Sequence, residues 1–353
     1  MSKFPLYTND GKWTWPLSHK QKQALSSLKD DIKNGSLKLV ENHCLCGNDK
    51  EQDDIVISEK DRYGLPIPQV LCKKCGLIRS KHVFDNESNE LFYKNSYRNI
   101  YTTGSPTDFF FFNQVKHGEK FIKILESQDI LSKIENVAEI GCGAGGILLP
   151  FLKQGKIVSG YDFNKEYLDF GNKFQLNLNF GDYSDQLKDD CCDLIILSHV
   201  MEHFLHPIKE IYDIAKKIKM GKYLLVEVPS SLDIAKAYKN PIFYFQNAHI
   251  YNFYQDYLKV FFDSLGFKVE YSDELCIFLL KKERNTSMPE FIYNKSLEDK
   301  SKHITNYLLD SKKQWQAPQN IIYRTYYKFN TVVMLYRSLF MIKWKITHKN
   351  FAK

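Results

Sequence analysis

The stretch EIGCGAGG, residues 139–146, is the part of the sequence that decides the fold. It overlaps the end of the apolar run NVAEIG, residues 136–141, which has the composition of a buried strand. Glycine has no Cβ, so it adopts positive φ values easily and lets a ligand approach the main chain. Glycines directly after a strand therefore predict a ligand-binding turn at the carboxyl end of that strand.

The glycines satisfy two ligand-binding patterns. G-x-G-x-x-G, at positions 141, 143 and 146, is the fingerprint of dinucleotide-binding proteins. E-x-G-x-G-x-G is the turn that binds S-adenosylmethionine, and it is formed here by Glu139, Gly141, Gly143 and Gly145. In both patterns an acid at the end of the second strand holds ribose hydroxyls, and Asp162 has the position for either.

The segments from residue 131 to residue 284 alternate between strand-like and helix-like patterns. Strands separated by helix-length segments predict an α/β, doubly wound sheet of mainly parallel strands. The last two strand-like runs, FKVEYSDE and CIFLLKKE, are joined too closely for a crossover helix, so we expect them to pair antiparallel. This pair and Asp182, which follows the third strand, favour the S-adenosylmethionine pattern over a parallel dinucleotide-binding sheet.

On these motifs, residues 131–284 resemble a class I S-adenosylmethionine-dependent methyltransferase. The resemblance implies a seven-stranded sheet whose last strand is antiparallel. It implies that Glu139, Gly141 and Gly143 lie near the methionine moiety, with Gly145 in the same turn. It also implies Asp162 on the ribose and Asp182 near the adenine. A nicotinamide-binding enzyme, or a glycine turn without a ligand, remains the alternative.

The stretch SHVMEHF, residues 198–204, spells H-x-x-E-H, which is also a zinc-protease signature. Its position argues against a protease, because it follows the fourth strand, CDLIILS, and precedes a helix that starts at Pro207. The resemblance implies that His199 faces the methyl donor or the acceptor, while Glu202 and His203 anchor the loop.

Two further residues are expected at the carboxyl ends of the strands. Glu227 ends the fifth strand, and His249 lies in FQNAHIYNF, between that strand and the next helix. In the resembling family this insertion covers the acceptor. A histidine near neutral pH is a suitable base for removing a proton from an alcohol. We expect His249 to be the catalytic base, His199 to be the second candidate, and Glu227 to orient the base.

Four cysteines form two close pairs, Cys44-x-Cys46 and Cys72-x-x-Cys75, each followed by a glycine. Two thiolate pairs across a short loop predict a tetrahedral zinc site. His43-x-x-Cys46 has the more usual spacing, so His43 is an alternative to Cys44. The stretch DRYGLP…VLCKKCGLIRS resembles the zinc module that precedes the methyltransferase domain in bacterial deoxysugar and surface-polysaccharide enzymes.

That resemblance implies a sugar, nucleotide-sugar or surface-glycan acceptor. Other small molecules, lipids and proteins remain alternative acceptors, and a non-catalytic scaffold in a glycan-assembly complex is the alternative of another class. SHVM stands where methyltransferases that modify the amino groups of nucleic acids carry Asn/Asp-Pro-Pro-aromatic, which argues against a nucleic-acid acceptor.

We divide the chain into an N-terminal arm (1–40), the cysteine module (41–80), an aromatic helical lid or linker (81–130), the methyltransferase-like domain (131–284) and a C-terminal extension (285–353). No apolar run approaches the ~20 residues of a membrane span. The N-terminus lacks the apolar core of a signal peptide, so we expect a cytoplasmic protein with reduced cysteines.

The C-terminal residues 321–353 carry seven basic side chains and no acidic one, which accounts for the whole net charge of +7. Apolar residues recur there at helical spacing. The tail is either a helix that packs on the protein or on a second subunit, or an interfacial helix on an anionic membrane at the inner face. Phosphates of a nucleic acid are the remaining possibility.

Overall fold

The computed structural model describes residues 4–101 and 107–321, which form two compact units. Of the described residues, the first unit contains 4–101, 230–257 and 291–321, and the second contains 107–229 and 258–290. The expectations about the basic tail fall on residues 322–353, outside the described residues. Within the described part of the chain, no helix is long and apolar enough to cross a membrane.

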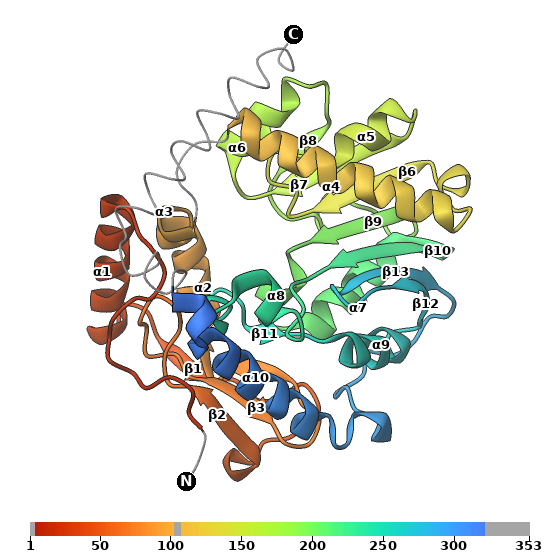
Figure 1. Cartoon of the computed structure of the whole chain (residues 1–353). Coiled ribbons are helices and arrows are strands. Elements are labelled where there is room, and N and C mark those ends of the chain that lie inside the picture. The colour runs from red at the N-terminus through yellow and green to blue at the C-terminus, as the bar shows by residue number, and fades with distance from the viewer. Residues whose placement is uncertain (1–3, 102–106, 322–353) are drawn as a thin grey trace. The chain divides into compact units, whose positions relative to one another are not determined.

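The second unit is built on a seven-stranded sheet with the order β12-β13-β10-β9-β6-β7-β8 (Figure 1). Its strands are β6 (Asn136–Ile140), β7 (Ile157–Asp162), β8 (Leu178–Phe180), β9 (Cys192–Ser198), β10 (Ile218–Glu227), β12 (Phe267–Ser272) and β13 (Ile277–Lys282). The strands β8, β7, β6, β9 and β10 pair parallel, whereas β13 pairs antiparallel with both β10 and β12. The predicted sheet, including its antiparallel end, is therefore confirmed.

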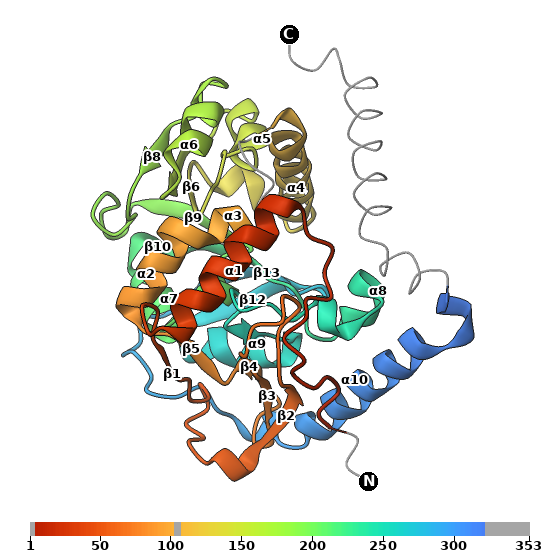
Figure 2. The same cartoon turned by 90° about the vertical axis from the view of Figure 1, so that its left-hand side faces the viewer.

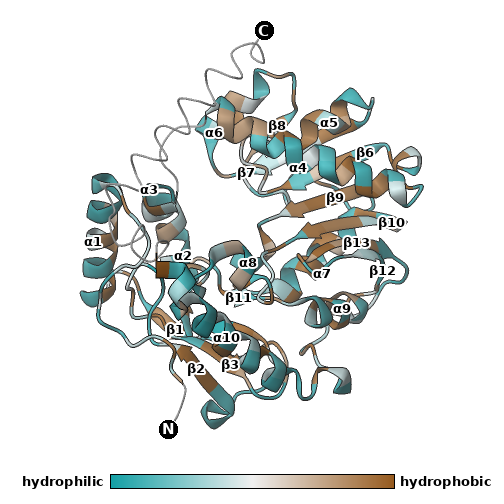
Figure 3. Cartoon of the chain, viewed as in Figure 1, coloured by the Kyte–Doolittle hydropathy of each residue, from teal (hydrophilic) through white to brown (hydrophobic). Residues whose placement is uncertain are grey.

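Apolar strands in the middle of this sheet are covered on both faces. In Figure 3, β9 and β10 are hydrophobic along most of their length, and six of the seven residues of β9 are buried. Continuous apolar strands are typical of parallel sheets with helices on both sides. The helices of this part of the chain are α4 (Asp108–Ser127), α5 (Leu148–Lys153), α6 (Lys165–Asn172), α7 (Pro207–Lys217) and α9 (Gln255–Ser264), the last of which spans the division between the units.

Two helix starts follow from local sequence. Thr107 caps α4 by accepting a hydrogen bond from the backbone N–H of Phe110 at 3.2 Å. Pro207 occupies the first turn of α7, where its missing N–H removes no intrahelical bond. Ile211, Ile214 and Ala215 form the buried side of α7, which explains its amphipathic pattern.

The first unit contains two small sheets, with the strand orders β1-β5 and β11-β4-β3-β2. Its strands are β1 (Leu39–Glu41), β2 (Asp54–Ser58), β3 (Gln69–Cys72), β4 (Ile78–Ser80), β5 (His82–Phe84) and β11 (Tyr251–Asn252). Its helices are α1 (His19–Lys33), α2 (Asn86–Phe92), the π-helix η2 (Tyr93–Tyr97), α3 (Arg98–Tyr101), α8 (Ile234–Tyr238) and α10 (Lys300–Gln316). Figure 2 shows α1 beside α3, against which it packs.

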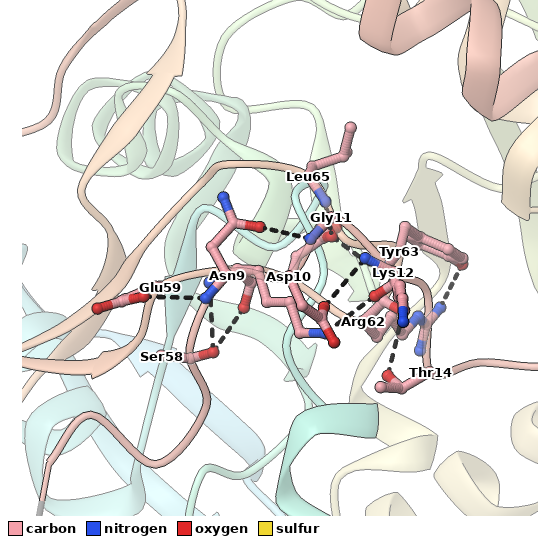
Figure 4. A network of polar contacts seen from close by, with 12 residues as sticks. Asn9, Asp10, Gly11, Lys12, Thr14, Ser58, Glu59, Arg62, Tyr63 and Leu65 are labelled. Atoms are coloured by element: carbon pink, nitrogen blue, oxygen red, sulfur yellow. Dashed lines mark hydrogen bonds and ion pairs between the residues drawn. The ribbon is translucent and has the colours of Figure 1, made fainter.

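The N-terminal arm is fixed along residues 57–65 of the same unit (Figure 4). The backbone N–H of Leu6 donates to the carbonyl of Ile57 at 2.8 Å, and that of Thr14 donates to the carbonyl of Arg62 at 2.8 Å. A Cβ on Gly64 would lie 2.7 Å from the carbonyl oxygen of Gly11, so the two chain segments touch through their main chains. The arm is therefore an integral part of the first unit.

The compact units interleave along the chain, unlike the linear division made from sequence. The helix α4 begins the second unit, although it was grouped with the aromatic segment 81–130. Residues 230–257, which hold His249, belong to the first unit, where β11 pairs antiparallel with β4. A strand pairing this distant in sequence leaves no local pattern, so sequence periodicity could not find it.

Candidate functional site

The glycine turn, residues 141–146, connects β6 to the segment before α5. Gly141, Gly143 and Gly145 have φ values of 70°, 57° and 70°, which side chains rarely adopt. A Cβ on Gly141 would lie 2.6 Å from Val200, and one on Gly145 would lie 2.6 Å from Leu178. Among the described residues, the atom nearest to a Cβ on Gly143 would be the Gln114 amide nitrogen at 3.2 Å, so Gly143 is the most open of these three positions there.

Asp162 ends β7 and holds the glycine turn. Its Oδ2 accepts a hydrogen bond from the backbone N–H of Gly143 at 2.9 Å, and its Oδ1 accepts one from Asn164 at 2.8 Å. A carboxylate has about four acceptor positions, so one carboxylate can hold backbone N–H groups and ribose hydroxyls at once. Asp162, which sequence analysis proposed as the ribose-binding acid, thus lies against the predicted glycine turn.

Glu139 is buried within β6, with 1% of its surface exposed. Its Oε2 has no hydrogen-bond partner among the described residues. Burial, with a further contribution from the charge of Asp162, raises the pKa of Glu139 well above its ordinary value. A buried carboxyl without such a partner fits a positively charged group, such as the amino group of the methionine moiety.

Asp182 is exposed, and its Oδ1 accepts a hydrogen bond from the backbone N–H of Ser184 at 2.8 Å. Two large rings next to the strand ends are also exposed: Phe163, which follows Asp162, by 72%, and Phe180 by 61%. Exposed phenyl rings beside acids suit a flat heteroaromatic ring with polar edges. Sequence analysis missed these phenylalanines, because isolated aromatic residues also occur in cores.

A cluster of ionisable side chains lies where β9 and β10 end. The Oε2 of Glu227 accepts a hydrogen bond from the Ser198 hydroxyl at 2.8 Å and lies 3.2 Å from His117 Nδ1. It also lies 3.7 Å from His199 Nε2, and the other oxygen lies 3.9 Å from Lys120 Nζ. Burial by itself would raise the pKa of Glu227, but His117, His199 and Ser198 outweigh that effect and lower it to about 2.

His199 lies between two carboxylates in this cluster. Its Nδ1 is 3.6 Å from Glu202 Oε1, and its side chain is 50% exposed. Burial opposes the charged imidazolium, but Glu202 and Glu227 outweigh it and raise the pKa of His199 above 6.5. His199 also has a φ of 57°, and its backbone N–H donates to the carbonyl of Glu227 at 2.8 Å. Residues held in this conformation often serve a site.

The contact between Gly141 and Val200 brings this cluster to the glycine turn. His199, which directly precedes Val200, therefore lies at the same edge of the sheet as the turn. The H-x-x-E-H stretch forms the end of β9 and the short 3-10 helix Met201–His203, so its histidines do not share an α-helical face. His203 Nε2 lies 3.8 Å from Glu202 Oε1.

His249 belongs to the first unit. It is buried, its ring contacts the side-chain amide of Gln246, and its carbonyl accepts a hydrogen bond from the Ser80 hydroxyl at 3.4 Å. Among the residues proposed from sequence for acid-base chemistry, the second unit brings together His199 and Glu227. It adds His117 of α4, which sequence analysis missed because its partner Glu227 is 110 positions away.

The four cysteines of the first unit converge. Their sulfur atoms lie within 4.8 Å of one another, and neighbouring pairs are 3.5 to 3.7 Å apart. A tetrahedral zinc with Zn–S bonds of ~2.3 Å requires sulfur separations of about 3.8 Å. The donor set of Cys44, Cys46, Cys72 and Cys75 therefore fits a zinc ion. Cys44 is buried in this cluster, while His43 is exposed.

Residues 291–304, which we call the closing segment, lie on both cysteine turns. A Cβ on Gly47 would lie 2.8 Å from the ring of Phe291, and one on Gly76 would lie 2.9 Å from Ile304. The backbone N–H of Ile292 donates to the carbonyl of Leu45 at 2.7 Å. Both glycines, with φ values of 74° and 76°, thus allow the chain to pack closely over the cluster.

Comparisons with known proteins give one family model and several solved structures that are similar to this chain. Residues 110–272 match the family model described as a methyltransferase domain. No curated protein matches the chain. Solved structures that are similar include a SAM-dependent methyltransferase from Archaeoglobus fulgidus, at 20% identity and a TM-score of 0.38, covering 57% of this chain and 93% of that one.

Two further structures are similar. One is a SAM-dependent methyltransferase from Methanosarcina mazei, at 16% identity and a TM-score of 0.35, covering 42% of this chain and 93% of that one. The other is an O-methyltransferase family protein from Burkholderia thailandensis, at 12% identity and a TM-score of 0.41, covering 57% and 64%. All three TM-scores are below 0.5, so the assignment depends on the family model and the strand order.

The strand order matches that of class I methyltransferases, and Glu139, Gly143 and Asp162 come together at the carboxyl ends of β6 and β7. The family match covers these three residues and every strand of the large sheet except β13. Residues 110–272 are therefore a class I S-adenosylmethionine-dependent methyltransferase domain.

Proposed function

We propose that this protein methylates a sugar, a nucleotide-sugar or a surface-glycan component, with a histidine as general base. The observation that carries the acid-base part is the position of His199 between Glu202 and Glu227, at the edge of the sheet that holds the glycine turn. S-adenosylmethionine, when bound, supplies a methyl group activated by the sulfonium. The chain then has to align the acceptor with that group and remove the acceptor's proton.

His199 can perform the proton removal in its neutral form. Glu202 and Glu227 stabilise the positive charge that the imidazole gains when it takes the proton. Glu227 remains ionised at neutral pH because its neighbours hold its pKa at about 2. Since the same carboxylates raise the pKa of His199, the turnover number should rise with pH through a pKa higher than that of an ordinary histidine.

Two substitutions test which histidine is the base. If His199 is the base, His199→Asn lowers turnover by roughly 10²–10⁴-fold and leaves S-adenosylhomocysteine affinity unchanged. His249→Asn is the matched test of the residue ranked first from sequence. Loss of turnover only in His249→Asn would assign the base to His249, and full activity of both variants would show that the reaction needs neither.

The acceptor class is supported by the resemblance of the cysteine module to the one in deoxysugar and surface-polysaccharide enzymes. The purified protein would be incubated with S-adenosylmethionine and a pool of nucleotide-linked sugars and glycan fragments. A product heavier by one methyl group identifies the acceptor, and the atom that bears the methyl separates O-, N- and C-methylation. A product only among lipids, proteins or other metabolites would refute a sugar acceptor.

We also propose that Cys44, Cys46, Cys72 and Cys75 hold a structural zinc ion. The support is the sulfur separations, the burial of all four side chains and the glycine after each pair. Bound zinc would stabilise the thiolates and cross-link two turns of a small module. Metal analysis should give about one zinc per chain, as four ligands imply.

The proposal that the protein rests on an anionic membrane depends on the basic residues 321–353. Co-sedimentation with vesicles tests it. Binding that requires anionic lipid, weakens with salt and disappears when residues 321–353 are deleted would support it. Full-length protein that ignores the vesicles would refute it.

A further inference from the structure

The glycine turn is held by a side chain from a different element, Gln114 of α4. The amide nitrogen of Gln114 donates to the carbonyl of Cys142 at 2.9 Å. Its amide oxygen accepts from the backbone N–H of Gly146 at 3.2 Å. One planar side chain thus bonds a carbonyl near the start of the turn and an N–H at its end.

The position of Gln114 is fixed by close main-chain contacts on both sides of it. A Cβ on Gly146 would lie 2.5 Å from the carbonyl oxygen of Phe111, and a Cβ on Gly118 would lie 2.3 Å from that of Ile147. The helix α4 therefore touches residues 146–147 one turn before and one turn after Gln114. These contacts leave α4 little freedom to move along the glycine turn. The side-chain amide of Gln114 is therefore held where it can bond both Cys142 and Gly146.

A turn with three glycines at positive φ needs such support. Glycine loses more conformational freedom on ordering than any other residue, so the unbound turn has a strong tendency to leave the binding conformation. When a site is formed only part of the time, the apparent affinity of its ligand falls to that fraction of the intrinsic affinity. Two hydrogen bonds from a packed helix remove that loss before the ligand arrives.

We propose that Gln114 is a positioning residue for the methyl donor, which holds the glycine turn in its binding conformation. It acts through the turn and has no assigned contact with the reacting atoms. The methyltransferase assignment implies that this turn lies near the methionine moiety. Gln114 should therefore matter for ligands that carry that moiety and should matter little for the nucleoside part.

The test compares two ligands on one variant. Gln114→Met keeps the length of the side chain and removes both hydrogen bonds. We expect S-adenosylhomocysteine to bind about 5- to 100-fold more weakly by calorimetry, the size expected for two lost intramolecular hydrogen bonds. 5′-Methylthioadenosine, which lacks the amino-acid part, should change by less than about 3-fold. Gln128→Met, at the half-buried residue that follows the end of α4, is the matched control and should bind both ligands normally.

A second measurement needs no ligand. In Gln114→Met the backbone amide of Gly146 should exchange its hydrogen faster than in the wild type, since its acceptor is gone. The amide of Gly143, bonded to Asp162, is the internal reference. Unchanged affinity for S-adenosylhomocysteine in a folded variant would overturn the proposal. Equal weakening of both ligands together with a lower Tm would also overturn it, because Gln114 would then serve only stability. Neither measurement depends on the acceptor.

Discussion

Gly143 in the glycine turn and Gly47 beside the cysteines both have positive φ values, 57° and 74°, but different neighbours occupy the space next to them. A Cβ on Gly47 would lie 2.8 Å from Phe291, whereas the nearest described atom to a Cβ on Gly143 would be the Gln114 amide nitrogen at 3.2 Å. At Gly47 the chain itself fills the place of the missing side chain. At Gly143 the space is more open, which suits a ligand. A glycine that follows a motif residue can therefore let the chain pack closely on itself or leave room for a ligand. The sequence alone does not distinguish these two uses.

The largest expected effect concerns the cysteine module. Cys72→Ser removes a ligand that lies 3.7 Å from Cys46 and should lower the zinc content from about one ion per chain to nearly none. Residues 41–80 should then become more sensitive to protease, because the metal that cross-links the two cysteine turns is lost. A zinc-free wild-type protein with four freely titrating thiols would contradict this prediction.

The next effect concerns the glycine turn. Gly143→Val places a β-branched residue at a φ of 57° and puts its Cβ 3.2 Å from the Gln114 amide. We expect S-adenosylhomocysteine to bind at least 10-fold more weakly, given a strain of about 1–3 kcal/mol for such a residue. Gly155→Val is the matched control. Gly155 has a φ of 73° with nothing within 4 Å, so this variant should lose stability and keep donor affinity.

Donor binding should also depend on pH through Glu139. Burial and the charge of Asp162 raise the pKa of Glu139, so the carboxyl tends to be protonated in the free protein. A donor ammonium group favours the ionised form, so binding releases a proton and becomes tighter as pH rises through the raised pKa. The change is at most about tenfold per pH unit. Calorimetry in buffers of different ionisation enthalpy measures the proton, and a pH-independent affinity would refute the pairing.

A smaller effect should follow from opening the closing segment. Phe291→Ala removes the ring that lies over Gly47, so zinc should leave the cysteines a few-fold faster when a chromogenic chelator is added. Lys295→Ala, at an exposed residue of the same segment, is the control. If the loss of Phe291 leaves the release rate unchanged, Gly47 is required by the local turn and its packing against Phe291 is incidental.

The smallest effect is expected for His43→Ala. His43 is exposed and lies outside the cluster of four sulfur atoms, so zinc content should not change. Stability should change by no more than about 0.5 kcal/mol, as for other surface substitutions. Loss of zinc in this variant would restore the histidine alternative that the C-x-C spacing left open.

The strands of the large sheet and the glycine turn were predictable because each is recorded in a short stretch of sequence. An apolar run such as residues 192–198 indicates a buried strand by its composition. The glycines after residue 140 indicate a turn in the same way. The two cysteine pairs were recognisable for the same reason. The interior glycine of α4, Gly118, was an overlooked sign of close packing, since glycine is unfavourable inside a helix.

The acids at the strand ends could also be placed from sequence, because parallel strands bring their carboxyl ends to one edge of a sheet. Asp162 and Glu227 illustrate this. The partners of these acids could not be placed in this way. His117, which contacts Glu227, is 110 positions away from it in the sequence. The same holds for the glycine turn, because Gln114 is 28 positions from Cys142 and 32 from Gly146, the two residues to which it bonds. His117 and Gln114 belong to α4, which precedes the sheet in the sequence. The sequence pattern of α4 does not indicate which residues of the sheet the helix will contact.

By itself the sequence determined the class of fold, the glycine turn and the grouping of the cysteines, since those features depend on residues close together in the chain. Only the tertiary structure decided that Cys44 rather than His43 joins the sulfur cluster, that Phe291 and Ile304 close over it, and that residues 230–257 join the first unit. The physical reason is the same in each case. Contacts between distant segments depend on how the side chains of both segments pack, and neither segment records that packing in its own sequence.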